Sequence, residues 1–386
     1  MEAFKYGKPV TGKYFVNREK ELNELFKLVN KIKLGAEINV ALIGLRRTGK
    51  TSILINLMNL LNKDKKIIPV FLDCYGIPSK TTFAKLILEK IKDAYIEKTK
   101  DLGYGKRVAS LIKQKASILL SKVATMEISV ANYLSLKMAF REGVTENLWE
   151  KAFEYAEILA KSKDLYFIVM LDEFPDIAIR WKEEFIKRFR SIIQQQNRVM
   201  YILTGSAVSY MIDMVNNIHS PLYRQLTLIR IEELPKSIIS KFVKSRLKID
   251  DKALDRYITL TGCFPDYVQR LGHIIASRFG TKKVTIAEVE EAYLDMLSEL
   301  NMEFASSLDK LNSKSKTYGD MIISLSKYES PVKIAENIRV PQGFLPKYLN
   351  YLIEIGIVRK LERGKYRLTD PVFRDWVLKK FELFYS

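Results

Sequence analysis

The sequence is poor in the residue types that build disulfide frameworks and transition-metal sites. Its 386 residues include two cysteines, Cys74 and Cys263, and two histidines, His219 and His273. Two cysteines are too few for a disulfide framework or a cysteine-rich metal cluster, and the histidines have no partners at ligand spacing. We therefore expect both cysteines to be small buried hydrophobes and expect no metal site built from cysteine or histidine.

Long apolar runs are absent as well. No stretch of 18 or more apolar residues occurs, although 47% of all residues are apolar, so we expect a globular protein without a membrane span. The first residues lack the apolar core of a signal peptide, which makes a cytoplasmic location the expectation. At roughly 150 residues per domain, the chain is long enough for two or three domains.

Acidic residues are in deficit. The chain has 64 Lys and Arg against 45 Asp and Glu, which gives a formal net charge of +19. An excess of this sign favours a polyanionic partner, nucleic acid first and an anionic membrane surface second. The alternative is the lysine-rich composition of a thermophile, which accounts for many charges of both signs but less well for the positive excess.

One stretch matches a phosphate-binding motif in full. Residues 44–51 read Gly-Leu-Arg-Arg-Thr-Gly-Lys-Thr, the pattern G-x-x-x-x-G-K-[ST], between an apolar strand pattern at 38–43 and a helical pattern at 51–61. Backbone N–H groups and a helix N-terminus can bind phosphate oxygens there. Lys50 can reach the β- and γ-phosphates and the Thr51 hydroxyl can ligate Mg²⁺, so the motif predicts a site for ATP and Mg²⁺.

The second half of this site is predicted at the end of an apolar strand pattern, in Asp172-Glu173. Asp172 can hold the Mg²⁺ hydration shell, and Glu173 can polarise the attacking water as a general base. Strand, helix and strand in this order predict a parallel α/β sheet. The remaining strands are predicted at 67–73, 199–204 and 226–231.

Two later segments have candidates for the transferred phosphate. Ser206 or Thr204, after the fourth strand, can contact the γ-phosphate, or the segment can be an ordinary turn. Arg224, before the fifth strand, can stabilise charge on the transferred phosphate, in cis or across a subunit interface. A simple surface arginine is an equal alternative.

Before the phosphate loop, the spacing of four apolar residues predicts an amphipathic helix. The residues on its apolar face are Leu22, Leu25, Phe26 and Val29. Asn17 is a good N-cap for this helix. The turn at residues 16–18 can lie beside an adenine or can simply begin a core helix.

A largely helical insertion is predicted at about residues 80–160. Alternating apolar and polar residues at 126–140 favour a hairpin within it. Residues 98–122 contain seven basic side chains and one acid, which fits a nucleic-acid contact or a solvated face.

The last third predicts helices followed by a basic hairpin. Helical patterns at 251–279 and 285–308 precede a linker at 312–316, and three further helices end at Gly356, a typical C′ glycine. Two short strands then pair about residues 362–364, and three helices with a basic hairpin are typical of a winged helix. This module can bind DNA, or it can pack on the ATPase or on a partner protein. The candidate DNA contacts are Lys347, Asn350, Arg359, Lys360, Arg363 and Lys365.

These residues together resemble the archaeal ATPase family, in the STAND class of AAA+-related P-loop NTPases. The arginine-pair phosphate loop, the Asp172-Glu173 strand end and the tail at 366–371 carry the resemblance, and Asn17 departs from a usual glycine. It implies an α/β ATPase core at 1–233 with the insertion, a helical lid at 234–311, a winged helix at 312–386, and switching more than fast turnover. The implied nucleotide contacts are Val16, Arg18, Gly44, Leu45, Arg46, Arg47, Thr48, Gly49, Lys50, Thr51, Ser52 and Pro265.

Three functions follow as alternatives. The first is a DNA-associated ATPase, and the second is an ATP-gated scaffold whose winged helix binds its own core or a protein partner. The third is an origin-recognition-like initiator, against which residues 204–206 and 262–265 argue because they depart from the patterns usual in that group. The sequence leaves a homo-oligomer possible in each case.

Overall fold

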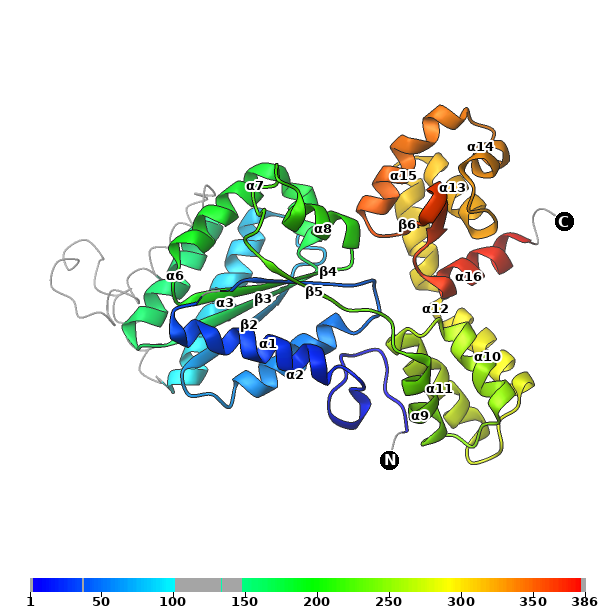
Figure 1. Ribbon diagram of the computed structural model, residues 1–386, viewed down its shortest axis with the longest axis horizontal. Helices are drawn as coiled ribbons and strands as arrows, with labels where there is room; N and C mark the ends of the chain where they lie inside the picture. The colour runs from blue at the N-terminus through cyan, green and yellow to red at the C-terminus, as the bar shows by residue number, and fades with distance from the viewer. Residues whose placement is uncertain (1–2, 37, 101–132, 134–147, 383–386) are drawn as a thin grey trace.

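The computed structural model describes residues 3–36, 38–100, 133 and 148–382 (Figure 1). Apart from residue 133, the hairpin predicted at 126–140 lies outside these residues, as does most of the basic stretch at 98–122. An α/β core, a set of helices at 236–312 that we call the lid helices, and a C-terminal unit at 316–382 follow one another along the chain. Within the described residues, no helix is long and apolar enough to cross a membrane.

The core is built on five parallel strands in the order β2-β3-β4-β1-β5. This order places the phosphate-loop strand β1 between β4 and β5. Because every pairing is parallel, the carboxyl ends of β1, β3 and β4 meet at one edge of the sheet. The strands are β1 (Val40–Ile43), β2 (Ile67–Asp73), β3 (Tyr166–Asp172), β4 (Val199–Gly205) and β5 (Thr227–Arg230).

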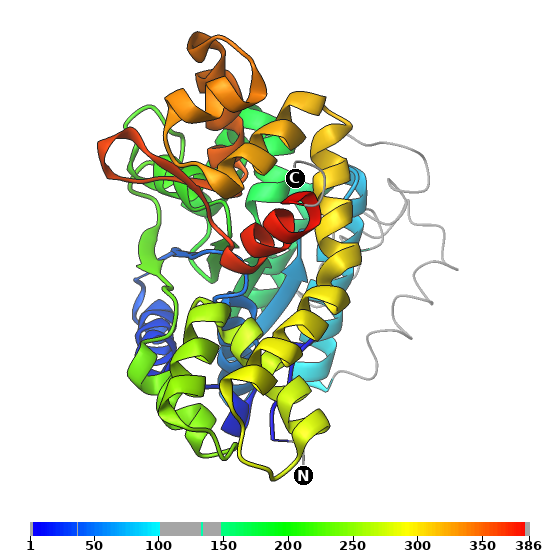
Figure 2. The same ribbon diagram turned by 90° about the vertical axis from the view of Figure 1, so that its right-hand side faces the viewer.

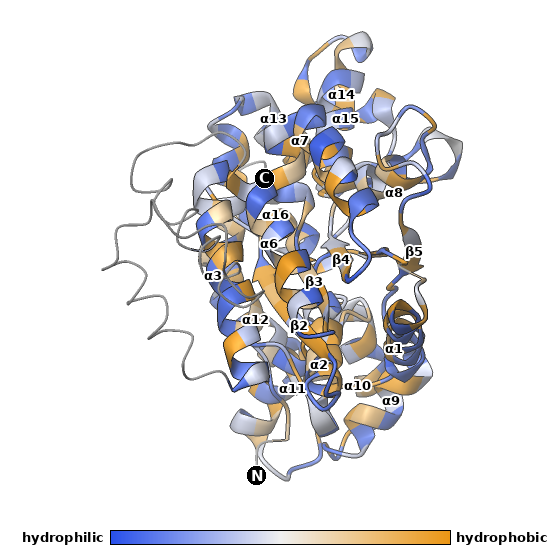
Figure 3. Cartoon of the chain, turned by 90° about the vertical axis from the view of Figure 1, so that its left-hand side faces the viewer, coloured by the Kyte–Doolittle hydropathy of each residue, from blue (hydrophilic) through white to orange (hydrophobic). Residues whose placement is uncertain are grey.

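Helices cover both faces of the sheet, which explains why the inner strands β1 and β4 are buried along their whole length. In β3, Phe167 and Val169 belong to the apolar cluster on one face, whereas Ile168 and Met170 belong to the cluster on the other. Figure 3 shows the apolar strands enclosed by helices. The first face holds α3 (Lys80–Thr99), α6 (Leu148–Ser162), α7 (Pro175–Gln195) and α8 (Val208–Asn216); the second holds α1 (Glu19–Lys31) and α2 (Lys50–Leu61).

The lid helices and the C-terminal unit share one apolar cluster. Helix α12 runs through both, since it packs against α10 and α11 and then against α13 and α16 (Figure 2). The predicted linker is the end of α12 followed by a three-residue turn, and the predicted domain limit at 312 stays a prediction. The lid helices are α9 (Lys236–Lys244), α10 (Asp251–Thr261), α11 (Pro265–Phe279) and α12 (Ile286–Asn312).

We call residues 316–382 the C-terminal unit. Its hairpin is antiparallel, with Arg359 opposite Arg367, as the sequence predicts. Its elements are α13 (Lys316–Lys327), α14 (Pro331–Ile338), α15 (Leu345–Glu354), β6 (Val358–Lys360), β7 (Tyr366–Leu368) and α16 (Pro371–Glu382). Short 3₁₀ helices lie at Gly12–Tyr14, Ile32–Leu34, Gln342–Phe344 and Glu362–Gly364.

Candidate active site

The loop between β1 and α2 lies at the carboxyl edge of the sheet, and its first glycine has no room for a side chain. The Gly44 N–H donates to the Gly205 carbonyl of β4 at 3.3 Å. A Cβ on Gly44 would lie 2.3 Å from the Ile231 carbonyl oxygen. Gly49, with φ of 94°, forms the N-cap of α2 in a backbone conformation that favours glycine. The motif glycines are therefore required by close packing and by backbone direction.

Lys50 lies inside this loop. Its side chain is 4% exposed, and Nζ donates to the carbonyls of Gly44 (2.9 Å) and Leu45 (3.0 Å). Nζ also lies 3.7 Å from Glu173 Oε1. Burial lowers the pKa of Lys50, and the neighbouring carboxylates oppose that shift. The loop thus holds one ammonium group at the place where a phosphate chain would bind.

Asp172 and Thr51 meet beside the loop. The Thr51 hydroxyl donates to Asp172 Oδ2 at 2.6 Å, and the Thr204 hydroxyl donates to the other carboxylate oxygen. Burial raises the pKa of Asp172 in spite of these two hydrogen bonds. A hydroxyl and a carboxylate are the hard oxygen ligands that Mg²⁺ takes in nucleotide sites, so the residues present fit that ion.

Glu173 is held by the end of the neighbouring strand. Its N–H donates to Thr204 Oγ1 at 3.1 Å, and its Oε2 accepts from the Ser206 hydroxyl at 2.7 Å and the Ser206 N–H at 3.1 Å. Burial alone would raise its pKa, but Lys50 and the hydrogen bonds from Ser206 lower it. Glu173 is therefore ionised near neutral pH, as a general base requires. The predicted contact of Ser206 with a γ-phosphate stays a prediction, because its hydroxyl is engaged with Glu173.

These groups line one cavity of about 750 Å³ whose lining includes both charged and apolar residues. We call the part of the lining that includes Val16, Phe242 and Pro265 the apolar end, so the structure brings the predicted residues Val16 and Pro265 to the same cavity as the phosphate loop. A cavity of this size and mixed lining is typical of a cofactor or substrate pocket.

Arg18 also lines the cavity, but its guanidinium is hydrogen-bonded to other protein groups. It is 5% exposed, and its guanidinium donates to the carbonyls of Thr48 (3.1 Å) and Glu232 and to Glu21 Oε1 (3.1 Å). The prediction that Asn17 is the N-cap of α1 is wrong, because Arg18 occupies that position. Asn17 has φ of 52°, a left-handed conformation that asparagine tolerates better than most residues.

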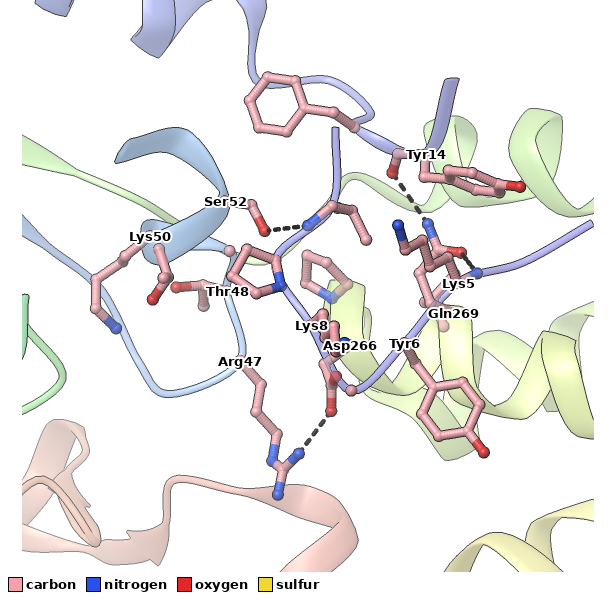
Figure 4. Close-up of a pocket in the computed structure, with 18 of the residues that line it drawn as sticks. Lys5, Tyr6, Lys8, Tyr14, Arg47, Thr48, Lys50, Ser52, Asp266 and Gln269 are labelled. Carbon is pink, nitrogen blue, oxygen red and sulfur yellow. Dashed lines mark hydrogen bonds and ion pairs between the residues drawn. The ribbon is translucent and has the colours of Figure 1, made fainter. Parts of the chain in front are cut away.

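Sequence reasoning missed the N-terminal segment, which crosses the cavity between α2 and the lid (Figure 4). The Val10 N–H donates to Ser52 Oγ at 3.0 Å, and the Lys5 N–H donates to Gln269 Oε1 at 3.0 Å. Phe4 is fully buried in the lid cluster. The only signals in the sequence were the aromatic residues close to the start, Phe4 and Tyr6, which are not specific.

The two arginines of the phosphate loop differ in their surroundings. Arg47, with φ of 66°, places its guanidinium 2.5 Å from Asp266 Oδ2 and 2.5 Å from Glu303 Oε1 on the lid. It also lies 3.8 Å from Asp370 Oδ2 of the C-terminal unit and over the Tyr267 ring at 4.8 Å. Burial alone would lower the pKa of Arg47, but Tyr267 and these carboxylates raise it.

Arg46 is exposed and has a different neighbour. Its guanidinium lies 5.7 Å from the centre of the Tyr75 ring, in the segment after β2. The sequence predicted both arginines as nucleotide contacts. Both arginines line the cavity in the structure, but only Arg47 forms ion pairs with carboxylates among the described residues.

The remaining predicted residues lie elsewhere. Arg224 is exposed in the turn before β5, and its N–H donates to the Val215 carbonyl, so it lies at the amino edge of the sheet, opposite the cavity. This position does not support the prediction that Arg224 stabilises the transferred phosphate within its own chain. The candidate DNA contacts lie on α15 and the hairpin, where Lys347, Asn350, Arg359, Lys360 and Lys365 are exposed and Arg363 lies in the connecting turn.

The fold and the site agree with the comparisons to known proteins. A profile of an ATPase domain predominantly from Archaea matches residues 15–271. A Walker-type ATPase of Pyrococcus abyssi superposes with a TM-score of 0.65 at 17% identity, covering 94% of this chain and 96% of that chain, which shows the fold alone.

Two other solved structures superpose less closely. The ADP form of the Aeropyrum pernix ORC2 protein gives a TM-score of 0.48 at 12% identity, covering 98% of this chain and 97% of that chain. The Pyrobaculum aerophilum Cdc6p gives 0.46 at 15% identity, covering 100% and 98%. No curated protein sequence matches. Because the profile spans well over half of the chain, the chain belongs to this family of ATPase domains found predominantly in Archaea, and it is an ATPase.

Proposed function

We propose that this protein is a slow, Mg²⁺-dependent ATPase of the STAND class whose nucleotide state controls the docking of its C-terminal unit. The triphosphate binds at residues 44–51 and the adenine at the apolar end of the cavity. Thr51 and Asp172 hold Mg²⁺, which would neutralise charge on the phosphates. Glu173 takes the proton of the attacking water.

The role of the base is tested by replacing Glu173. Glu173→Gln keeps the size of the side chain and its capacity to accept from Ser206, so ATP and Mg²⁺ should bind with nearly unchanged affinity. General-base catalysis contributes about 10²–10⁴-fold, so hydrolysis should fall by that factor. Full turnover by the Gln variant in a single-turnover assay would reject this role.

The observation that carries the switch is that the C-terminal unit contacts the site from two directions. A Cβ on Gly356, just after α15, would lie 2.7 Å from the Ser206 carbonyl oxygen, next to the hydroxyl that holds Glu173. Asp370 approaches Arg47 of the phosphate loop. A change in either segment on ATP binding or hydrolysis would therefore reach the C-terminal unit directly, which supports nucleotide-gated docking.

Docking is measured as a distance between two spin labels. Glu184 on α7 and Lys333 on α14 are both exposed, so cysteine replacements there, with Cys263→Ser, report the separation of core and C-terminal unit. We expect different distance distributions with ADP and with ATP trapped by the Glu173→Gln variant. Identical distributions in the two states would reject the switch.

A second proposal concerns the partner. We propose that the exposed face of α15 and the hairpin bind duplex DNA in the manner of a winged helix. Leu345, Leu349 and Leu352 are buried, which leaves Lys347 and Asn350 outward, and the hairpin adds further exposed cations. The net charge of +19 supports a polyanionic partner. A protein partner at the same face is the alternative.

Salt dependence separates these partners. Binding to a DNA duplex should weaken steeply with salt, because each phosphate contact contributes to the slope of log K against log [salt]. Arg359→Glu with Lys360→Glu should reduce both affinity and slope. The matched control, Lys20→Glu with Lys27→Glu on α1, changes the charge equally at another exposed face. Equal losses in the two variants, or no saturable binding near physiological salt, would reject the DNA proposal.

A further inference from the structure

Phosphoryl transfer is commonly accelerated by a positive charge in addition to one lysine and Mg²⁺. Charge builds up on the transferred phosphoryl group, and an arginine placed beside it commonly accelerates transfer by about 10³–10⁵-fold. Arg224, the candidate from the sequence, lies at the other edge of the sheet. Within the part of the chain that the structure describes, six cations besides Lys50 line the cavity: Lys5, Lys8, Arg18, Arg46, Arg47 and Arg270.

Three of these cations already form hydrogen bonds or ion pairs with other protein groups. Arg18 is held by two carbonyls and Glu21, and Arg47 is held by carboxylates of the lid. Arg270 pairs with Glu299 at 3.0 Å and lies over the Tyr6 ring at 4.4 Å. Moving any of them toward a phosphate would leave partly buried polar or charged groups without a partner, which is costly.

Two more of the cavity cations lie in the N-terminal segment. Lys5 and Lys8 belong to the N-terminal segment, which the Lys5 N–H attaches to Gln269 of α11. Figure 4 shows both beside the lid helix, with the phosphate loop between them and Lys50. Both belong to this N-terminal segment and not to the phosphate loop itself.

Arg46 remains, and its position is suitable. It shares the cavity wall with Lys50, Asp172 and Glu173. None of the ion pairs among the described residues includes Arg46. Its neighbour Tyr75 is 51% exposed, and a cation–π contact at an exposed site is worth only about 0.5–1 kcal/mol, so the guanidinium is free to turn toward a phosphate.

We propose that Arg46 is the arginine that stabilises the transition state of ATP hydrolysis, in cis and from within the phosphate loop. This inference rests on the proposed ATP site. The water oxygen forms a bond to the γ-phosphorus, and the bond from that phosphorus to the β–γ bridging oxygen breaks, with its electron pair going to ADP. The water proton goes to Glu173 and then to the released phosphate. Arg46 donates hydrogen bonds to the γ-oxygens as charge develops on them.

The test uses a transition-state mimic so that its readout does not depend on turnover. Aluminium fluoride with MgADP imitates the planar phosphoryl group, and it tightens ADP binding only where the stabilising charges are in place. We expect Arg46→Ala to bind MgADP within about threefold of wild type and to lose at least 100-fold of the gain that aluminium fluoride produces. Arg46→Lys should recover little, because a lysine lacks the planar fork of an arginine.

Arg224→Ala is the matched control. It also removes an exposed arginine from a loop, but this arginine does not line the cavity. It should keep the full gain from aluminium fluoride, and the gain should not depend on protein concentration. A gain that Arg46→Ala retains, or that Arg224→Ala loses, would overturn the inference while leaving the ATP site intact. If wild-type protein binds no MgADP at all, the proposed function itself fails.

Discussion

A single methyl group at Gly356 should test whether the C-terminal unit controls the active site. Gly356 has φ of 77°, and the Thr369 hydroxyl fixes its carbonyl with a 2.8 Å hydrogen bond. In Gly356→Ala the new Cβ would lie 2.7 Å from the Ser206 carbonyl oxygen and 3.1 Å from Ala207 Cα. Real Cβ atoms do not approach a backbone oxygen this closely, so α15 and the loop after β4 must separate.

Two costs add up in this variant. An alanine in the left-handed region costs about 1–2 kcal/mol, and the forced separation adds about 1–3 kcal/mol, as overpacking does. Gly364→Ala isolates the first cost, because Gly364 lies in the same unit with φ of 71° and has no atom within 4 Å of its Cβ position. The difference between the two variants therefore measures the contact with the core.

The assay compares ADP release and stability in both variants. Both should lose about 1–2 kcal/mol of unfolding free energy from backbone strain. Only Gly356→Ala should release a fluorescent ADP analogue faster, by about tenfold for each 1.4 kcal/mol of lost docking, and only it should shift the spin-label distance between core and C-terminal unit. Equal ADP release and equal distances in Gly356→Ala and Gly364→Ala would refute the proposed coupling.

Two further variants test the site itself. Gly44→Ala should abolish MgATP binding, measured by calorimetry, because its Cβ would lie 2.3 Å from the carbonyl oxygen of Ile231. Ile231 follows β5 and is held in place because its N–H donates to the Ile43 carbonyl of β1 at 2.7 Å. Binding within tenfold of wild type would contradict this geometry. Thr204→Val keeps the shape of the side chain but removes the hydroxyl that bonds Asp172 and the Glu173 N–H. We expect it to lose about 1–3 kcal/mol of stability in urea unfolding and to require more Mg²⁺ for hydrolysis, whereas an unchanged Mg²⁺ titration would reject the assigned role.

The sheet and the phosphate loop were predictable because their signals are local. Strand β2 occupies the predicted residues 67–73, and β5 is shorter than its predicted range by one residue at each end. Strands enclosed between two layers of helices need largely apolar runs, and a phosphate loop needs glycines at fixed spacing, so both leave patterns in a short window. Asp172 and Thr51 follow from those two patterns, since parallel strands bring their carboxyl ends together.

Contacts between distant segments could not be predicted in this way. The partners of Arg47 lie 219 and 256 residues further along the chain, and the sequence has no pattern that joins them. The N-terminal segment was missed for the same reason. Arg224 is different, because a residue just before a parallel strand must lie at the amino edge of the sheet. Its distance from the cavity could therefore have been inferred from the predicted strand alone.

On the proposed mechanism, the two consecutive arginines let one loop serve both the reaction and the switch. Arg47 has a left-handed backbone, so the chain turns there, and the two side chains reach different neighbours: Arg46 lies beside Tyr75, whereas Arg47 reaches Asp266 and Asp370. We expect that any shift of the loop backbone that accompanies the turn of Arg46 toward a γ-phosphate also moves Arg47 relative to its carboxylates. Each 1.4 kcal/mol lost there changes the docked population about tenfold. Hydrolysis and docking are then opposed, which is a physical reason to expect slow turnover from a complete catalytic site.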